Sequence, residues 1–284
     1  TSVTPDGKYI SGWSNSDSFS GDAYVETPLL WEKQSDGTYR AIDVYAELPN
    51  FPKKTKLGTN TQQVRIDNVS PDGNILSGII NFVTPATVCY YVYNKTTQEC
   101  KYVDNALGEV PDETFVDEST MSNNGKYLTG IVQVAGGSYL SSYLYNTSDN
   151  SCTLYNSESE EQDRAGSAVS NTGVVFGCSP AVNPVRYAYV RVGKLWYGID
   201  EILSGRYDIN FYERTGYDYT GTIQGVSDDE KTMIGMSETK TKGYIIRLPE
   251  TISEAASSVN PLGTYAVSPV AGSKFAKFSQ MKLA

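Results

Sequence analysis

The stretch Val69-Ser70-Pro71-Asp72-Gly73-Asn74-Ile75-Leu76-Ser77-Gly78 has the composition of a tight chain reversal followed by a β-strand. Pro71 presets its own φ, Asp72 offers a side-chain acceptor, and Gly73 adopts backbone angles that other residues avoid. The apolar residues that come next continue the pattern of a strand. We call this stretch the signature turn, and it predicts a β-hairpin.

The signature turn recurs along the chain. Its Ser or Thr stands at positions 4, 70, 122, 170 and 227, so successive copies are separated by 66, 52, 48 and 57 residues. The other copies are Val3-Thr4-Pro5-Asp6-Gly7-Lys8-Tyr9-Ile10-Ser11-Gly12, Met121-Ser122-Asn123-Asn124-Gly125-Lys126-Tyr127-Leu128-Thr129-Gly130, Val169-Ser170-Asn171-Thr172-Gly173-Val174-Val175-Phe176-Gly177 and Val226-Ser227-Asp228-Asp229-Glu230-Lys231-Thr232-Met233-Ile234-Gly235.

Each period contains four short stretches with strand composition. Around Ser70 these are residues 63–69, 74–82, 87–93 and 100–103, and no helical periodicity separates them. Tyr93 and Cys100 recur 52 residues later as Tyr145 and Cys152, in step with the turns. Four strands per period of this length indicate a propeller blade. A β-sandwich with accidental turn similarity is the alternative.

The repeats resemble those of bacterial secreted and periplasmic β-propellers, including the Tol-system propellers and the HAF-type extracellular repeats. The resemblance covers about residues 1–250, and it rests on Pro-Asp-Gly-Lys followed by Ile-Ser-Gly. The fourth copy lacks Pro-Asp and the fifth lacks Gly. Because those families differ widely in function, the resemblance implies a fold and a location outside the cytoplasm, and no activity.

The chain is therefore expected to be all-β: a β-propeller over residues 1–250, with five four-stranded blades starting near residues 1, 63, 114, 163 and 220. A sixth, incomplete blade is the alternative. No fourth strand of the last blade is evident before Pro249, and Gly263 to Val267 could supply one. The segment 251–284 would pack on the propeller or close it, with a crossing loop over 251–260. Since Thr1 begins within a repeat, we expect a mature or trimmed form.

Composition excludes several functions. The formal net charge is 23 − 33 = −10, which repels phosphate backbones, so nucleic acid is a poor partner. The chain has no histidine, which excludes Ser-His-Asp and Cys-His catalysis within it. No apolar run reaches the roughly 18 residues of a membrane span.

Long connections opposite the signature turns are the expected place for ligands. The connection over 201–219 is rich in aromatic residues interleaved with carboxylates, which suits stacking on sugars or a protein interface. Packing of these rings over the connection itself is the alternative. The candidate ligand-binding residues are Tyr207, Phe211, Tyr212, Tyr217, Tyr219 and, in an earlier connection, Trp13.

Polar residues three and five positions before each signature Ser alternate on the innermost strand, so we expect them to share a face that lines a central channel. They are Arg65, Asp67, Asp117, Ser119, Ser167, Thr222 and Gln224. Asp67 and Asp117 on adjacent blades, with Asp163, could form the carboxylate set of a glycosidase. A solvated channel in which Arg65 neutralises an Asp is the alternative.

The sequence predicts no cofactor, although calcium on loop oxygens stays open, with Asp17, Asp22 and Glu26 as an acidic loop. Cys100 and Cys152 occupy equivalent strands and should not be bonded to each other. Three functions remain. The leading one is a non-enzymatic, exported binding or scaffold module, extracellular, at the cell surface or periplasmic, that engages a protein or glycan. The others are a carboxylate-only glycosidase or lyase and a structural subunit of a cell-surface assembly.

Overall fold

The chain forms two compact units. Unit 1 comprises Thr1–Gly136 and Tyr143–Leu154, and unit 2 comprises Gly137–Ser142 and Tyr155–Ala284. The computed structural model describes residues 2–16, 25–52, 56–57, 60–83, 86–103, 115–133, 140–155, 165–178, 187–217, 219–237 and 242–262.

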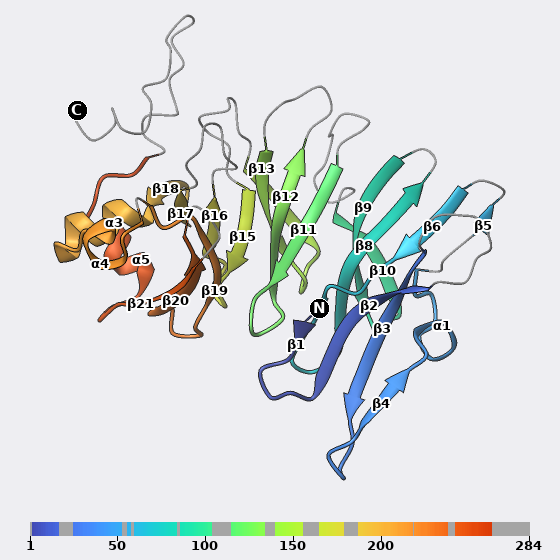
Figure 1. The fold of residues 1–284 in the computed structure, drawn as a ribbon. Coiled ribbons are helices and arrows are strands. Elements are labelled where there is room, and N and C mark those ends of the chain that lie inside the picture. The colour runs from blue at the N-terminus through green and yellow to red at the C-terminus, as the bar shows by residue number, and fades with distance from the viewer. Residues whose placement is uncertain are drawn as a thin grey trace, which may run out of the picture. The chain divides into compact units, whose positions relative to one another are not determined.

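Three antiparallel sheets lie wholly or mostly in unit 1 (Figure 1). The first has the order β1-β2-β3-β4, with bounds Ser2–Val3, Tyr9–Ser16, Val25–Lys33 and Tyr39–Ile42, followed by helix α1, Val44–Glu47. The second has the order β10-β9-β8-β6-β5, with β7 also on β8; its bounds are β5 Lys56–Leu57, β6 Asn60–Val64, β7 Asn68–Val69, β8 Ile75–Val83, β9 Ala86–Asn94 and β10 Glu99–Tyr102. The third has the order β11-β12-β13-β14, with bounds Phe115–Met121, Tyr127–Gln133, Leu140–Asn146 and Ser151–Tyr155.

Unit 2 contains two further antiparallel sheets and three helices. The fourth sheet has the order β15-β16-β17-β18, with bounds Ala165–Val169, Val175–Cys178, Ala188–Val192 and Leu195–Gly198. The fifth has the order β19-β20-β21, with bounds Thr222–Val226, Thr232–Met236 and Gly243–Arg247. The helices are α3 Ile199–Tyr207, α4 Phe211–Thr215 and α5 Ile252–Ala256. No helix in the described ranges has the length and apolar character needed to cross a membrane.

The five sheets confirm the predicted class, an all-β, five-bladed β-propeller. In each sheet consecutive strands pair antiparallel with their neighbours in the chain, as in a propeller blade. The second sheet fits this pattern because β6 and β7 together occupy the first position, both pairing with β8, and β5 adds a short hairpin. The fifth sheet has three strands among the described residues, as the lack of a fourth strand before Pro249 predicted.

The signature turns repeat one hydrogen-bond network. In the second sheet the Ser70 hydroxyl donates to Asp72 at 2.6 Å and accepts from the Ile75 amide at 2.8 Å, while Asp72 also accepts from the Asn74 amide at 3.0 Å. Thr4 with Asp6, Ser122 with Asn124, and Ser227 with Asp229 repeat the hydroxyl contact at 2.7, 2.8 and 2.5 Å. The motif thus satisfies its own backbone amides and fixes the reversal locally.

Signature glycines also allow one turn to approach the preceding one. Gly73 has a φ of +73°, and a Cβ added there would lie 2.3 Å from Cζ of Tyr9 in the first sheet. Gly125 has a φ of +75°, and its added Cβ would lie 2.5 Å from Cβ of Ser70. Both backbone conformation and close packing therefore require glycine at these positions.

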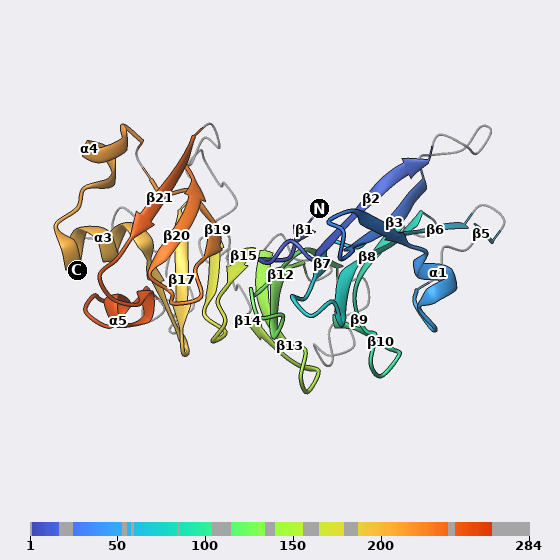
Figure 2. The same ribbon diagram turned by 90° about the horizontal axis from the view of Figure 1, so that it is seen from below.

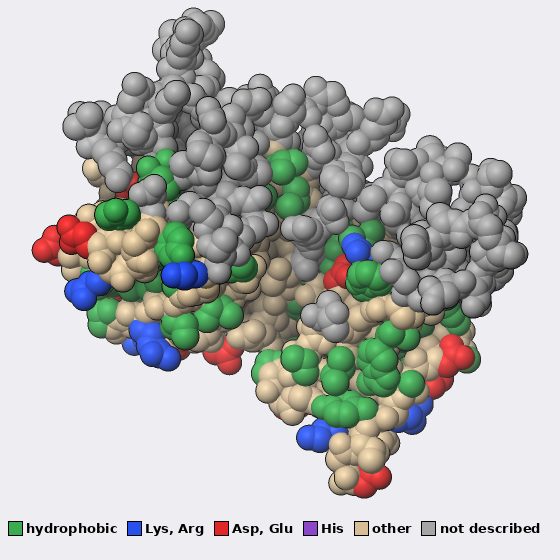
Figure 3. All heavy atoms as spheres, viewed as in Figure 1, with side chains coloured by type: hydrophobic (Ala, Val, Ile, Leu, Met, Phe, Trp, Pro, Cys, Tyr) green, Lys and Arg blue, Asp and Glu red, His purple; other side chains and the backbone are tan. Residues whose placement is uncertain are grey.

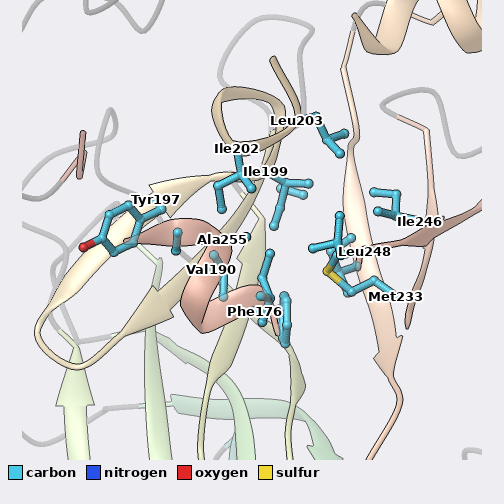
Figure 4. Close-up of a cluster of buried hydrophobic side chains, with 14 of the residues drawn as sticks. Phe176, Val190, Tyr197, Ile199, Ile202, Leu203, Met233, Ile246, Leu248 and Ala255 are labelled. Carbon is cyan, nitrogen blue, oxygen red and sulfur yellow. The ribbon is translucent and has the colours of Figure 1, made fainter. Parts of the chain in front are cut away.

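The core of unit 2 lies between its two sheets and the helices (Figure 4). Phe176 and Val190 from the fourth sheet meet Met233 from the fifth, and Ile202 of α3 and Ala255 of α5 close the cluster. Figures 1 and 2 both place α3, α4 and α5 together beside the fifth sheet. Helices α3 and α5 therefore contribute buried side chains to a core that the fourth and fifth sheets share.

One expectation about connections is wrong, and a second connection contains helices. The segment 251–260 is not a loop, because α5 begins in it with a capping box in which Thr251 and Glu254 exchange side-chain and backbone hydrogen bonds. The long connection 201–219 carries most of α3 and all of α4. The proposed strand over residues 263–267 lies outside the described residues. The described chain ends at Leu262, whose amide donates to the carbonyl of Trp196 on β18 at 2.6 Å.

Candidate binding site

A hollow of about 120 Å³ lies in unit 2 where α3, the linker after it and α4 meet the chain before β19. Three aromatic residues, one carboxylate and three other side chains line it. They are Asp200, Ser204, Ile209, Asn210, Phe211, Tyr212 and Tyr219. We call it the α3–α4 hollow.

Local sequence signals fold the chain around this hollow. Ile199, Ile202 and Leu203 are buried on one side of α3, which leaves Asp200 and Ser204, four residues apart, on another. Asp208 ends α3 in the left-handed conformation with a φ of 53°. The reversed chain then starts a second helix, α4.

The first turn of α4 is fixed by its cap. The Asn210 side chain accepts from the Glu213 amide at 3.2 Å, which begins α4 directly after the linker. This places Phe211 and Tyr212 in the first turn of α4. Phe211 is buried, whereas Tyr212 keeps 56% of its surface exposed. The hollow therefore combines an anchored ring with an accessible one.

A hydrogen-bond chain holds the carboxylate. Asp200 Oδ2 accepts from the Thr220 hydroxyl at 2.9 Å and from the Thr220 amide at 3.3 Å. Tyr244 donates its hydroxyl to the Thr220 carbonyl. Burial, together with the negative charge of Asp200, holds the pKa of Tyr244 well above its ordinary value, so this phenol stays protonated and remains a donor. The position of Asp200 is thus fixed by the protein.

The aromatic residues of the hollow are supported from behind. The ring of Phe211 packs edge-on against Tyr244, with 5.1 Å between centroids. The ring of Tyr219 packs against Tyr187 with 4.2 Å between centroids. Burial and a hydrogen bond with Tyr219 hold the pKa of Tyr187 well above its ordinary value. These contacts orient two of the three rings before any ligand arrives.

The structure brings only part of the predicted aromatic set together. Phe211, Tyr212 and Tyr219 line the hollow. Tyr207 instead donates its hydroxyl to Glu250 at 2.9 Å, and burial and this bond raise its pKa to about 12. Tyr217 lies outside the lining, with the Lys242 ammonium 5.5 Å from its centroid. Sequence reasoning missed Asp200 and Ser204, whose four-residue spacing on a helix would have been the signal.

Trp13 meets one of the predicted channel residues in unit 1, Arg65, which in turn pairs with a second. Trp13 is 37% exposed, and the Arg65 guanidinium carbon lies 5.6 Å from its ring centroid. Arg65 Nε lies 3.9 Å from Asp67 Oδ1. Arg65 thus lies beside Asp67, as expected, and the solvated channel that both were expected to line stays a prediction. The contact between Trp13 and Arg65 was not predicted, since Trp13 lies on β2 of the first sheet and Arg65 lies between β6 and β7 of the second.

Simple alternation of the inner-strand residues is interrupted by β-bulges. The register shifts between Asp117 and Ser119, between Gly166 and Ala168, and between Ile223 and Gly225. An extra residue in a strand breaks the two-residue period, so positions three and five before the signature Ser do not simply share a face. The assumption of uninterrupted alternation is therefore wrong in three blades.

The bulges leave the channel candidates in different surroundings. Ser167 donates to the Phe176 carbonyl at 3.3 Å, and Gln224 is exposed, whereas Thr222 is half-buried. The side chains of Asp117 and Ser119, and all of Asp163, lie outside the described residues, so the paired-carboxylate arrangement stays a prediction.

The described ranges contain no candidate metal site. No group of three or more Asp, Glu or Cys side chains in those ranges could hold a metal ion. The side chains of Asp17, Asp22 and Glu26 lie outside the described residues. Among the described side chains, no disulfide joins Cys100 to Cys152. Burial raises the pKa of the Cys100 thiol to about 11, so it is unreactive at neutral pH.

Comparison with solved structures finds β-propellers at low sequence identity. The β-propeller domain of the Trilobed protease from Pyrococcus furiosus is 12% identical, with a TM-score of 0.46 over 87% of this chain and 69% of that chain. An acylaminoacyl peptidase in complex with a chloromethyl ketone is 8% identical, with a TM-score of 0.48 over 87% of this chain and 38% of that chain. An oligogalacturonate lyase in complex with manganese is 10% identical, with a TM-score of 0.36 over 87% of this chain and 76% of that chain. No protein-family model and no curated protein matches the sequence.

Proposed function

We propose that this chain is an exported, non-enzymatic binding module that captures a protein or glycan partner at the α3–α4 hollow. The observation that carries the proposal is the exposed ring of Tyr212, 56% accessible, beside the fixed carboxylate of Asp200. An exposed aromatic ring next to oriented polar groups is the usual composition of a recognition site. Export is supported by the resemblance of the signature turn to secreted and periplasmic propeller repeats.

A binding role is favoured over glycoside cleavage by the surroundings of the described acids. Asp67, one of the candidate catalytic carboxylates, lies beside the positive charge of Arg65. Asp200 accepts two hydrogen bonds from Thr220, which hold the carboxylate in place. A general acid needs the opposite environment, one that keeps the proton at neutral pH.

Partner capture by a Tyr212→Ala variant tests the proposal. Arrays of glycans and of cell-surface proteins, probed with and without calcium, first identify a partner of the unaltered chain. The variant should lose at least about tenfold in affinity, since truncating an exposed aromatic anchor removes most of its contact area. Ile245→Ala is the matched control, because Ile245 is 59% exposed in the same unit and is not a lining residue of the hollow. Equal capture by both variants would overturn the proposal.

A further inference from the structure

The size of the α3–α4 hollow limits what can enter it. Sites for drug-sized ligands enclose roughly 300–1,000 Å³. The hollow offers about 120 Å³, enough for one side chain or a small group of a larger partner. The rest of that partner must lie outside the hollow.

The charge of the described lining is negative. Among the described residues that line the hollow, Asp200 alone carries a formal charge. The neighbouring basic residue of α3, Arg206, pairs with Glu250 at 2.9 Å. Figure 3 shows both acidic and basic side chains at the surface over the helical part of unit 2, so the charge that matters inside the hollow is that of Asp200. An anionic group would be repelled here, whereas a cation would gain the field of a fixed carboxylate.

The aromatic residues favour the same sign of charge. Phe211, Tyr212 and Tyr219 all line the hollow, and aromatic faces attract cations within about 6 Å of the ring centroid. Tyr217, close by in the sequence, already has the Lys242 ammonium at 5.5 Å. A lysine ammonium is a compact point charge on an apolar stem, whereas a guanidinium is a wide planar fork. The small volume therefore favours lysine.

We propose that the α3–α4 hollow receives the ammonium group of a lysine side chain from a basic protein partner, with Asp200 as its counter-ion and Tyr212 against its stem. This inference rests on the proposed function and narrows its partner to a protein. The net charge of −10 attracts such a partner over longer distances. A neutral sugar in the same hollow is the outcome that would contradict it.

Calorimetric titration with two peptides tests the inference. Acetyl-Gly-Lys-Gly-amide supplies the side chain, and the same peptide with norleucine supplies an isosteric stem without charge. The lysine peptide should bind at least about tenfold more tightly than the norleucine peptide, because only the ammonium meets a charge and aromatic faces. Equal affinity for the two peptides, or binding of neither, would overturn the inference.

Two matched variants locate the effect. Asp200→Asn keeps an oxygen that can accept from Thr220 and removes the charge, so lysine-peptide affinity should fall about tenfold. Asp208→Asn removes the same charge at an exposed helix end whose left-handed conformation suits Asn, and it should leave affinity within about twofold. Equal losses in the two variants would show a general charge effect and overturn the assignment to Asp200. Unfolding midpoints of both variants check that the fold is kept.

Failure of this inference is distinguishable from failure of the proposed function. If the lysine peptide does not bind while Tyr212→Ala abolishes capture of a glycan, the hollow is a binding site and the lysine assignment is wrong. If Tyr212→Ala changes neither glycan capture nor protein capture, both proposals are wrong.

Discussion

The carboxylate of Glu230 accepts a hydrogen bond from the hydroxyl of Ser170 at 2.6 Å, which joins the signature turns of the fourth and fifth sheets. Glu230 occupies the position of the signature glycine with a φ of 57° and is only 5% exposed. Thr172 also donates to it, and Ser253 donates from α5 at 3.3 Å. One side chain thus connects two turns and a helix of unit 2.

Replacing Glu230 should destabilise unit 2. Glu230→Ala removes the acceptor and leaves the buried Ser170 hydroxyl without this partner, at a cost of about 1–3 kcal/mol in the free energy of unfolding. Glu230→Gln retains one acceptor oxygen and should lose less. Urea unfolding followed by fluorescence measures both, and an unchanged midpoint for Glu230→Ala would contradict the role of this contact.

The signature Asp residues should make the protein sensitive to acid. Burial of Asp72 is outweighed by hydrogen bonds from Ser70 and Asn74, so its pKa is lowered, and the pKa values of Asp6 and Asp229 are lowered by bonds from Thr4 and Ser227. A carboxyl whose pKa is lower in the folded state stabilises the fold above its unfolded value, about 3.9. That stabilisation is lost as the pH falls from about 4 through the lower folded value.

The third sheet provides an internal control for this acid sensitivity. Asn124 holds the Asp position there and makes the same bonds to Ser122 and Lys126, at 2.8 and 3.0 Å, without a titrating group. Asp72→Asn should therefore flatten the dependence of the unfolding midpoint on pH below about 4, and Asn124→Asp should steepen it. Parallel pH profiles for the two variants would refute the explanation.

Contacts between successive turns should be sensitive to a single methyl group. Gly73→Ala introduces a Cβ 2.3 Å from Cζ of Tyr9 and also strains a positive φ. Gly37→Ala is the matched control, because its φ of +86° carries the same strain while its Cβ would meet nothing within 4 Å. The control should cost about 1–2 kcal/mol and Gly73→Ala about 1–3 kcal/mol more. Equal unfolding midpoints for the two variants would disprove the packing role of Gly73.

Sequence reasoning predicted what depends on local chemistry. Turns such as Ser70 to Gly73 carry their own hydrogen-bond partners, so their positions and the strands beside them could be placed without tertiary information. The helices α3 and α5 were missed, although Ile199, Ile202 and Leu203 have helical spacing and Thr251 with Glu254 forms a capping box.

Other features depend on contacts that no local pattern encodes. The bulge near Ser167 consists of one extra residue against its partner strand, and it leaves no signal in the composition. Trp13 and Arg65 are 52 positions apart and meet only after two sheets pack. The α3–α4 hollow is lined by Asp200 as well as by Phe211 and Tyr219. This carboxylate comes close to the predicted rings only when α3 folds, so the sequence pattern did not indicate it.

The two ways of joining neighbouring turns have a consequence for exchanging blades between positions in the chain. In unit 1 the signature glycines Gly73 and Gly125 leave space for Tyr9 and Ser70 of the preceding turn, so this contact requires a residue without a side chain. In unit 2 the same position is filled by the Glu230 side chain, which needs hydroxyl donors in the turn before it and in α5. The turn with Glu230, moved into unit 1, would place a side chain where the preceding turn leaves no space and where its carboxylate would lack the hydroxyl donors. Tandem copies of this repeat are therefore alike in sequence without being interchangeable parts.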